Sequence, residues 1–249
     1  MKALVTGASS GIGRDMTRYL VGLGYEVFAV ARNVEKLEEL SHELGERVKI
    51  ISADISKKEV CYELYENLKK EKIDLLINNA GFGVFGNFAQ IDLEKELNLI
   101  DTNITAVHIL TKLFLQDMVK ENKGRILNVS SIAGSSPGPL MAAYYASKAY
   151  VLRLTEAVSE ELKKQKSNVT VSVLCPGPVA TNFNNVADVK FSIKALPSEN
   201  VAKYAIDKTL KGKLIIIPGI KIKILRFLSK ISPDKITMKV VYKNQKRKK

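Results

Sequence analysis

The chain has 249 residues, of which 46% are hydrophobic and 26% are charged, and its formal net charge is +13. This length suits one large α/β domain, and the composition is too apolar for a disordered protein. The only two cysteines, Cys61 and Cys175, lie in apolar periodic segments. We therefore expect two reduced thiols in the core rather than a disulfide.

The positive charge is concentrated at the C-terminal end. Residues 211–249 contain 13 lysines and arginines and one acidic residue, Asp234, whereas residues 1–210 hold 26 basic and 25 acidic side chains. The charge therefore belongs to a separate tail. Gly7 interrupts the N-terminal apolar stretch before a signal-peptide core can form, and no apolar run reaches the roughly 18 residues of a membrane span. The expected location is the cytoplasm.

Short apolar runs rich in β-branched residues alternate with amphipathic segments along the first 217 residues. Such alternation without hairpin turns predicts a parallel sheet covered by helices on both faces. We expect one doubly wound, seven-stranded, Rossmann-like α/β domain of three layers over residues 1–217, followed by a basic amphipathic extension at 218–249. The predicted strands span residues 2–6, 26–31, 48–52, 73–78, 125–130, 169–174 and 213–217.

The first predicted strand leads into a glycine-rich loop, T-G-A-S-S-G-I-G at residues 6–13, and a helix follows. Gly7 suits a tight turn, Gly11 lets the backbone approach a phosphate, and Gly13 allows close packing of the helix on the strand. The helix N-terminus adds unpaired N–H groups that favour a pyrophosphate. Taken alone, the loop also fits a plain strand-to-helix turn, because its spacing is not G-x-G-x-x-G.

The end of the second predicted strand bears on the choice of cofactor. An acidic side chain there would bind a ribose 2′-hydroxyl, but the sequence reads A-R-N at residues 31–33. A guanidinium offers a planar fork of donors that suits a 2′-phosphate. Arg32 therefore favours NADP(H), with NAD(H) as the alternative cofactor and a solvated arginine as the purely structural interpretation.

Hydroxyl-bearing residues follow the fifth predicted strand. The sequence N-V-S-S-I at residues 128–132 ends this strand, and Y-Y-A-S-K at residues 144–148 opens a helix. Tyr144 and Lys148 are four positions apart, so they share one helix face. The ordinary pKa of tyrosine, about 10, makes it a poor base at neutral pH, and a nearby ammonium favours the phenolate. A single pair with this spacing is nevertheless common on structural helices.

These segments together resemble the single-domain branch of the short-chain dehydrogenase/reductase family. Its T-G-x-x-x-G-x-G loop, its N-N-A-G motif (residues 78–81) and its Y-x-x-x-K pair occur at the family's spacing within residues 1–217. The resemblance implies an enzyme that interconverts a carbonyl and an alcohol with a nicotinamide cofactor. It identifies the catalytic tetrad as Asn103, Ser131, Tyr144 and Lys148.

By this resemblance, Tyr144 exchanges the substrate proton, Ser131 hydrogen-bonds the substrate oxygen, Lys148 binds the nicotinamide ribose, and Asn103 holds a water behind Lys148. Ser130 and Tyr145 are neighbouring alternatives. The four-residue register selects Tyr144, and the interval of thirteen residues before it then selects Ser131.

The resemblance also implies the cofactor contacts. Asp54 corresponds to an aspartate that contacts adenine, and P-G-x-V-x-T at residues 176–181 borders the nicotinamide. The family's second NADP marker, a basic residue before Gly11, is replaced here by Ser10. No metal site is expected. The expected cofactor-binding residues are Gly7, Ser9, Ser10, Gly11, Ile12, Gly13, Arg32, Asp54, Ile55, Asn79, Ala80, Gly81, Tyr144, Lys148, Pro176, Gly177, Val179 and Thr181.

Apolar residues after two of these motifs indicate a substrate pocket. Phe82, Phe85 and Phe88 follow the N-N-A-G motif, and we expect a substrate loop at residues 182–197. The loop offers Phe183, Val186, Val189, Phe191, Ile193 and Leu196. These side chains are either core residues or the lining of a pocket for a lipophilic carbonyl compound.

The tail departs from the compact family pattern. Ile224, Phe227, Leu228 and Ile231 share one face of a predicted basic helix. Such a helix lies at an anionic membrane surface, or docks on its own domain or on a second copy of the chain in a homo-oligomer. A disordered basic end is the third interpretation. Nucleic acid is not an expected partner of the basic tail, because Phe227 and Tyr242 are its only aromatic residues that could stack on bases.

Two other functions compete with an oxidoreductase. One is a catalytically silent dinucleotide-binding regulator, and the other is a peripheral membrane protein whose function resides in the tail. A silent regulator is expected to have a broken tetrad, whereas all four residue types are present here. The sequence therefore favours the enzyme.

Overall fold

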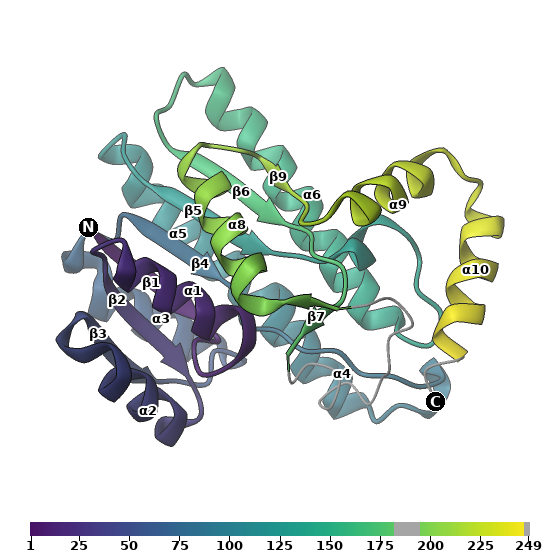
Figure 1. Ribbon diagram of the computed structural model, residues 1–249, viewed down its shortest axis with the longest axis horizontal. Coiled ribbons are helices and arrows are strands. Elements are labelled where there is room, and N and C mark those ends of the chain that lie inside the picture. Colours follow the sequence, from purple (N-terminus) through teal and green to yellow (C-terminus); the bar gives the residue numbers. More distant parts are fainter. Residues whose placement is uncertain (182–194, 247–249) are drawn as a thin grey trace.

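A seven-stranded parallel sheet forms the centre of the computed structural model, which describes residues 1–181 and 195–246 (Figure 1). The strand order is β3-β2-β1-β4-β5-β6-β9. The predicted doubly wound, seven-stranded fold is confirmed. The strands are β1 (Lys2–Thr6), β2 (Glu26–Ala31), β3 (Val48–Ser52), β4 (Leu75–Asn78), β5 (Arg125–Val129), β6 (Thr170–Leu174) and β9 (Ile215–Ile216).

Helices cover both faces of this sheet. They are α1 (Gly11–Gly22), α2 (Val34–Leu44), α3 (Lys58–Leu68), α4 (Leu93–Ile100), α5 (Ala106–Lys120), α6 (Ala142–Lys164), α8 (Ser198–Leu210), α9 (Ile220–Ile231) and α10 (Asp234–Lys246). Short helical segments are η1 (Gly45–Arg47), η2 (Lys69–Glu71), η3 (Phe88–Gln90), η4 (Asp101–Thr105) and η5 (Ile132–Ser135). A separate parallel pair joins β7 (Val179–Ala180) to β8 (Leu196–Pro197).

The three predicted layers are visible in the two main core clusters. On one face, α1, α2 and α8 bury residues such as Leu20, Leu37 and Ile206 against the sheet. On the other face, α3, α5 and α6 do the same with residues such as Leu64 and Leu110. Central strands that are buried on both faces need a continuous apolar run, and all four positions of β4 are indeed buried.

The two cysteines are buried free thiols, as predicted. Four of the seven strands were predicted with wrong boundaries. The strands expected at 125–130 and 169–174 are each one residue shorter, as β5 and β6. The strand expected at 73–78 begins at Leu75, and the strand expected at 213–217 is reduced to Ile215–Ile216. The latter strand lies at the edge of the sheet and pairs with β6 alone, so fewer of its apolar residues join the ladder.

The strand order reverses between β1 and β4. Because loops leave the two strands in opposite directions at such a point, open sheets bind ligands there, beyond the carboxyl ends of the strands. The glycine-rich loop follows β1, and the N-N-A-G motif follows β4. The fold therefore brings both motifs to one end of the sheet.

The tail forms two helices, α9 and α10, which extend beyond α6 (Figure 1). In α9, Ile222 and Arg226 are buried, and the Arg226 guanidinium lies 3.3 Å from a carboxylate oxygen of Glu156 on α6. The tail therefore docks on its own domain. No helix in the described part of the chain has the length and apolarity needed to cross a membrane.

Candidate active site

A cavity of about 780 Å³ lies at the carboxyl ends of the strands. It is lined from the glycine-rich loop at one end to the tail helices at the other. With one exception, Gly13, every residue expected to contact the cofactor lines it. Gly13 instead supports the loop, because a Cβ there would lie 2.3 Å from the Gly7 carbonyl oxygen.

Two glycines of the loop adopt left-handed backbone conformations that side chains disfavour, with φ of 67° at Gly7 and 52° at Gly11. A Cβ at Gly11 would also lie 2.9 Å from the Thr181 side chain. Ser10 precedes the first residue of α1 and makes no capping hydrogen bond through its side chain. The first N–H groups of α1 are therefore not capped by it, and the loop fits a pyrophosphate.

Asn79 connects the end of β4 to the glycine-rich loop through three hydrogen bonds. Its backbone N–H donates to the Thr6 hydroxyl over 3.0 Å, and its Nδ2 donates to the carbonyl oxygens of Thr6 (3.0 Å) and Gly7 (3.2 Å). The side chain of Asn79 therefore holds the strand-to-helix turn in shape. These hydrogen bonds hold together the two loops that follow β1 and β4, where the strand order reverses.

The end of the cavity at the glycine-rich loop carries the residues expected at the adenosine. Arg32 is exposed on its wall, and within the described residues its guanidinium has no ion-pair partner. Asp54 lines the same end, where its carboxylate accepts hydrogen bonds from the Ser56 N–H and hydroxyl over 3.2 and 2.9 Å. An unpaired guanidinium beside a phosphate-binding loop suits an additional phosphate.

Ser131, Tyr144 and Lys148 come together on the cavity wall. The Tyr144 hydroxyl is hydrogen-bonded to the Ser131 side chain, and Lys148 Nζ lies 5.9 Å from the centre of the Tyr144 ring. The Ser130 hydroxyl instead donates to the Lys148 carbonyl oxygen over 2.6 Å and is buried. This geometry favours Ser131 over Ser130 as the residue that meets a substrate.

Burial dominates the electrostatics of this group. It raises the pKa of Tyr144 to about 12, against the opposing effect of the hydrogen bond with Ser131. It lowers the pKa of Lys148 to about 8, and Lys148 Nζ donates to the Val129 carbonyl oxygen over 2.9 Å. At neutral pH, Tyr144 is therefore a phenol and Lys148 is mostly protonated. The expected lowering of the Tyr144 pKa by Lys148 is not found, because burial dominates the shift and the opposing effect comes from Ser131.

Replacing Lys148 by methionine is expected to stabilise the fold near neutral pH. Its pKa falls from 10.5 to about 8 on folding, which is a cost of about 3 kcal/mol for the buried ammonium. That cost is complete below pH 8 and disappears as the pH rises above the ordinary lysine value. Losing the hydrogen bond to the Val129 carbonyl oxygen offsets about 1 kcal/mol of this gain in stability. Thermal unfolding at pH 7 should show a melting temperature about 4–8 °C higher, with a smaller gain at pH 10.

The matched control is Lys163→Met on the same helix, where the side chain is exposed and little change is expected. A lower melting temperature for Lys148→Met at pH 7 would contradict the assigned cost of burial.

Asn103 lies behind this group rather than on the cavity wall, and it is fully buried. It lies in η4, a π-helical segment of the kind that is frequent at functional sites. Its Nδ2 donates to the Phe82 carbonyl oxygen over 2.9 Å and to the Ser147 hydroxyl over 3.1 Å. A Cβ at Gly81 would lie 2.8 Å from Asn103 Oδ1 and 3.2 Å from Lys148 Nζ. Asn103 and Lys148 thus flank one small residue.

The expected aromatic pocket is only partly present. Phe82 lines the cavity, and Phe85 packs in a neighbouring apolar cluster. Phe88 is 68% exposed and does not line the cavity, so it belongs neither to the core nor to this pocket. It lies in the short helical segment η3, at the surface. Most of the expected substrate loop, residues 182–194, lies outside the described residues, and Leu196 belongs to β8.

The tail supplies a cavity wall that the sequence did not predict. The residues concerned are Ile222 and Leu225 of α9 and Val241, Asn244 and Gln245 of α10. The apolar face noted in the sequence is a different one, since Ile224, Phe227 and Ile231 are more than half exposed. Only the four-residue spacing of Val241 and Gln245 could have indicated a docked face in α10.

Known proteins resemble this chain over most of its length. The family model for short chain dehydrogenases matches residues 1–190. Nodulation protein G of a Rhizobium species is 36% identical over 178 residues, which is 71% of this chain and 72% of that protein. Human 17-beta-hydroxysteroid dehydrogenase type 3 is 36% identical over 185 residues, which is 72% of this chain and 59% of that protein.

The fold has solved counterparts as well. A short-chain dehydrogenase from Sphingobium yanoikuyae, solved in complex with NADPH, has a TM-score of 0.82 and 28% identity, with 88% of each chain covered. The family match covers most of the chain, and most of the fold superposes on that solved structure. The chain therefore belongs to the short-chain dehydrogenase/reductase family and is an oxidoreductase of alcohol and carbonyl groups that uses a nicotinamide dinucleotide.

Proposed function

We propose that this enzyme reduces a lipophilic ketone or aldehyde with NADPH, and oxidises the corresponding alcohol in reverse. One observation carries the proposal. A single cavity joins a phosphate-binding loop and Arg32 at one end to Ser131, Tyr144 and Lys148 at the other. A nicotinamide dinucleotide laid along it would bring its reactive ring to the three polar side chains, with its 2′-phosphate near Arg32.

The residues of the chain supply the proton and the orientation, while the bound cofactor supplies a hydride to the carbonyl carbon. Ser131 positions the carbonyl oxygen by a hydrogen bond. As negative charge develops on that oxygen, Tyr144 donates its phenolic proton to it. The high pKa of Tyr144, about 12, keeps the phenol protonated at neutral pH and so suits the reductive direction.

The proton must then be replaced on Tyr144. The Lys148 ammonium lies one helical turn away and stabilises the phenolate that remains. We assign to Asn103, which flanks the same glycine, a water that passes a proton from solvent. Because Lys148 has a pKa of about 8, this support weakens above that pH, and the rate of reduction should fall there.

An apolar substrate is supported by the lining beyond Tyr144. Phe82, Met141, Ile222, Leu225 and Val241 contribute there. Among the described lining residues, the charged ones are Arg32, Asp54 and Lys148, all assigned to the cofactor or to catalysis. The name of one relative, 17-beta-hydroxysteroid dehydrogenase type 3, also points to a lipophilic alcohol.

The direct test is NADPH consumption with ketones of increasing apolar size, alongside short keto acids. We expect kcat/KM to rise with apolar size and to be lowest for the charged acids. Cofactor binding without turnover of any carbonyl compound would instead support the silent dinucleotide-binding regulator.

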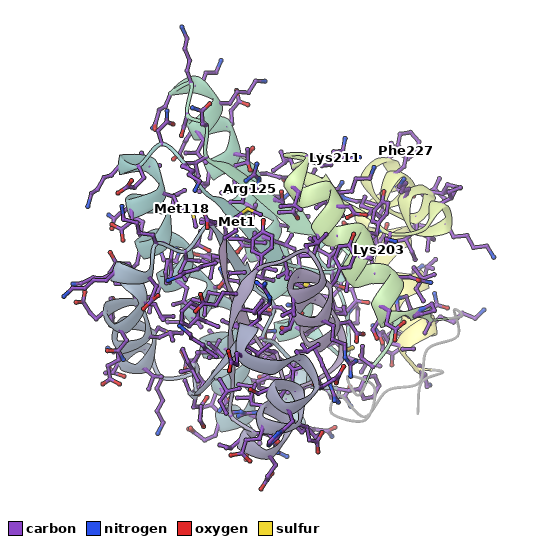
Figure 2. The ribbon with its side chains drawn as sticks, turned by 60° about the vertical axis from the view of Figure 1, so that its left-hand side comes forward. Met1, Met118, Arg125, Lys203, Lys211 and Phe227 are labelled. Carbon is purple, nitrogen blue, oxygen red and sulfur yellow. The ribbon has the colours of Figure 1, made fainter. Side chains whose placement is uncertain are left out.

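We further propose that the enzyme is a cytoplasmic protein that associates peripherally with anionic membranes through the tail. In α9, Ile220, Ile224 and Phe227 are 53–75% exposed, and Figure 2 places Phe227 on the outer side of that helix, away from the domain. Exposed lysines accompany them, among them Lys221 and Lys223. Apolar side chains flanked by lysines match the interface of an anionic bilayer.

Binding to vesicles that contain anionic lipid is therefore expected, and it should weaken as salt rises because salt screens surface charge. The double variant Ile224→Gln/Phe227→Gln should lose most of the co-sedimentation. Tyr62→Gln, a change at a half-exposed side chain of α3, should not. Absence of co-sedimentation together with a dimer in solution would favour the alternative in which this face contacts a second copy of the chain.

A further inference from the structure

The last helix reaches the active site through one face only. Thr237, Val241 and Gln245 are spaced four residues apart in α10, and all three are partly or fully buried. Gln245 is only 2% exposed, although its neighbours on the helix are exposed. Val241 and Gln245 both line the cavity. The end of the chain therefore presents a buried amide to the substrate end of the cavity.

This amide is joined to the tyrosine next to the proposed acid. Gln245 Nε2 donates to the Tyr145 hydroxyl oxygen over 2.7 Å. The Tyr145 ring lies 6.1 Å from the Tyr144 ring, centre to centre, at an angle of 77°. The Tyr145 ring packs closely on Gly138, where a Cβ would lie 2.0 Å from the ring. The pair Tyr145–Gln245 is thus a fixed polar element beside Tyr144.

The pair has unused hydrogen-bonding capacity. In the contact with Gln245, the Tyr145 oxygen accepts, so its own hydroxyl proton remains to be donated. Burial raises the pKa of Tyr145, which keeps this proton in place at neutral pH. Gln245 Oε1 is buried and has no hydrogen-bond partner within the part of the chain that the structure describes. The Tyr145 hydroxyl therefore has a proton left to donate, and Gln245 Oε1 is an unused acceptor with almost no accessible surface; neither group carries a net charge.

The surroundings of the pair are mostly apolar. Met141, the N-cap residue of α6, lines the cavity together with Ile222, Leu225 and Val241. Asn244 is the polar exception among the tail residues of the lining. A buried acceptor that has no hydrogen bond among such residues costs free energy, and a ligand group that donates to it would recover this cost. A hydroxyl group or a second carbonyl on the ligand would match the pair, whereas a charged group would find no counter-ion among the described residues there.

We infer that Tyr145 and Gln245 recognise a second, uncharged oxygen of the substrate, so that the preferred substrate is an apolar ketone that carries a hydroxyl or a second keto group. This inference rests on the proposed function, because it places the reacting carbonyl at Ser131 and Tyr144. It makes Gln245, near the end of the chain, a specificity-determining residue. A site built to hydrogen-bond a group on the substrate discriminates strongly against an analogue that lacks it.

The test compares two fused-ring ketones with the same carbon skeleton, one of which carries a hydroxyl group remote from the ketone. For the unaltered enzyme, kcat/KM with NADPH should be about 10- to 100-fold higher for the hydroxyketone. Tyr145→Phe and Gln245→Met should each lower kcat/KM for the hydroxyketone toward the value for the simple ketone. Tyr145→Phe keeps the ring that packs on Gly138, so its fold is expected to persist.

Lys243→Ala is the matched control, since Lys243 is an exposed residue of the same helix that does not line the cavity. It should leave the preference intact. Equal kcat/KM for the two ketones, or a preference that survives both variants, would overturn the inference and leave the proposed function standing. Reduction of neither ketone would overturn the proposed function and this inference with it.

Discussion

Replacing Tyr144 by phenylalanine is expected to lower kcat for carbonyl reduction by about 10²- to 10⁴-fold, the usual contribution of a positioned acid. The phenol is the proposed proton donor to the substrate oxygen, and the ring that packs beside Lys148 is retained. The dissociation constant of NADPH should change little, because phosphate and ribose contacts lie elsewhere on the cavity wall. Steady-state kinetics and a fluorescence titration of NADPH measure the two quantities.

Tyr145→Phe is the natural comparison for this variant. Its hydroxyl contacts Gln245 rather than the Ser131–Tyr144 group, so it should lower kcat far less. If Tyr145→Phe were the inactive variant and Tyr144→Phe the active one, the assignment of the acid would be wrong.

Replacing Arg32 by aspartate is expected to reverse the choice of cofactor. The guanidinium has no ion-pair partner among the described residues and is available for a 2′-phosphate. A carboxylate there would repel that phosphate and would accept a hydrogen bond from a ribose 2′-hydroxyl. Loss of a charge-assisted contact together with new repulsion should weaken NADPH binding by about 10²-fold or more.

Dissociation constants for NADPH and NADH, measured on both proteins, test this expectation. Arg47→Asp makes the same change of charge at an exposed arginine away from the cavity, and it should alter neither constant. A parent enzyme that already binds NADH more tightly than NADPH would contradict the role given to Arg32.

The sequence predicted the fold well because each strand of the main sheet carries its own local signal. The apolar run of β4 and the glycines before α1 follow from burial and backbone geometry that neighbouring residues impose. Errors occurred where tertiary context decides. The edge strand β9 has one partner only, and an apolar run by itself does not reveal how much of it will pair.

That the residues of the glycine-rich loop and of the N-N-A-G motif would line one cavity was predictable for the same reason, since they follow the strands directly. The wall formed by α9 and α10 was not. The sequence emphasised the face that contains Ile224 and Phe227, because it is the most apolar, yet the helix docks through Ile222 and Arg226. The partner of Arg226 is Glu156, 70 residues earlier, and no local pattern encodes a pair at that distance.

Because the tail docks on the domain, removing it is expected to affect catalysis as well as membrane binding. A truncation at residue 220 would leave the four residues of the tetrad in the chain, because all of them lie upstream. Ile222, Leu225 and Gln245 line the cavity, so the truncation would open the substrate end to water. Point substitutions on the outer side of α9 therefore separate membrane binding from catalysis more cleanly than deletion.

Transfer of a labelled hydride tests the central claim most directly. NADPH carrying deuterium at the reactive carbon of the nicotinamide is incubated with the enzyme and an apolar ketone, and the product is analysed by mass spectrometry. We predict an alcohol with one deuterium on the former carbonyl carbon, formed in equal amount to the NADPH consumed and formed at least about 100-fold more slowly with Tyr144→Phe. Consumption of NADPH without labelled alcohol, or labelled alcohol formed equally well by Tyr144→Phe, would contradict this account.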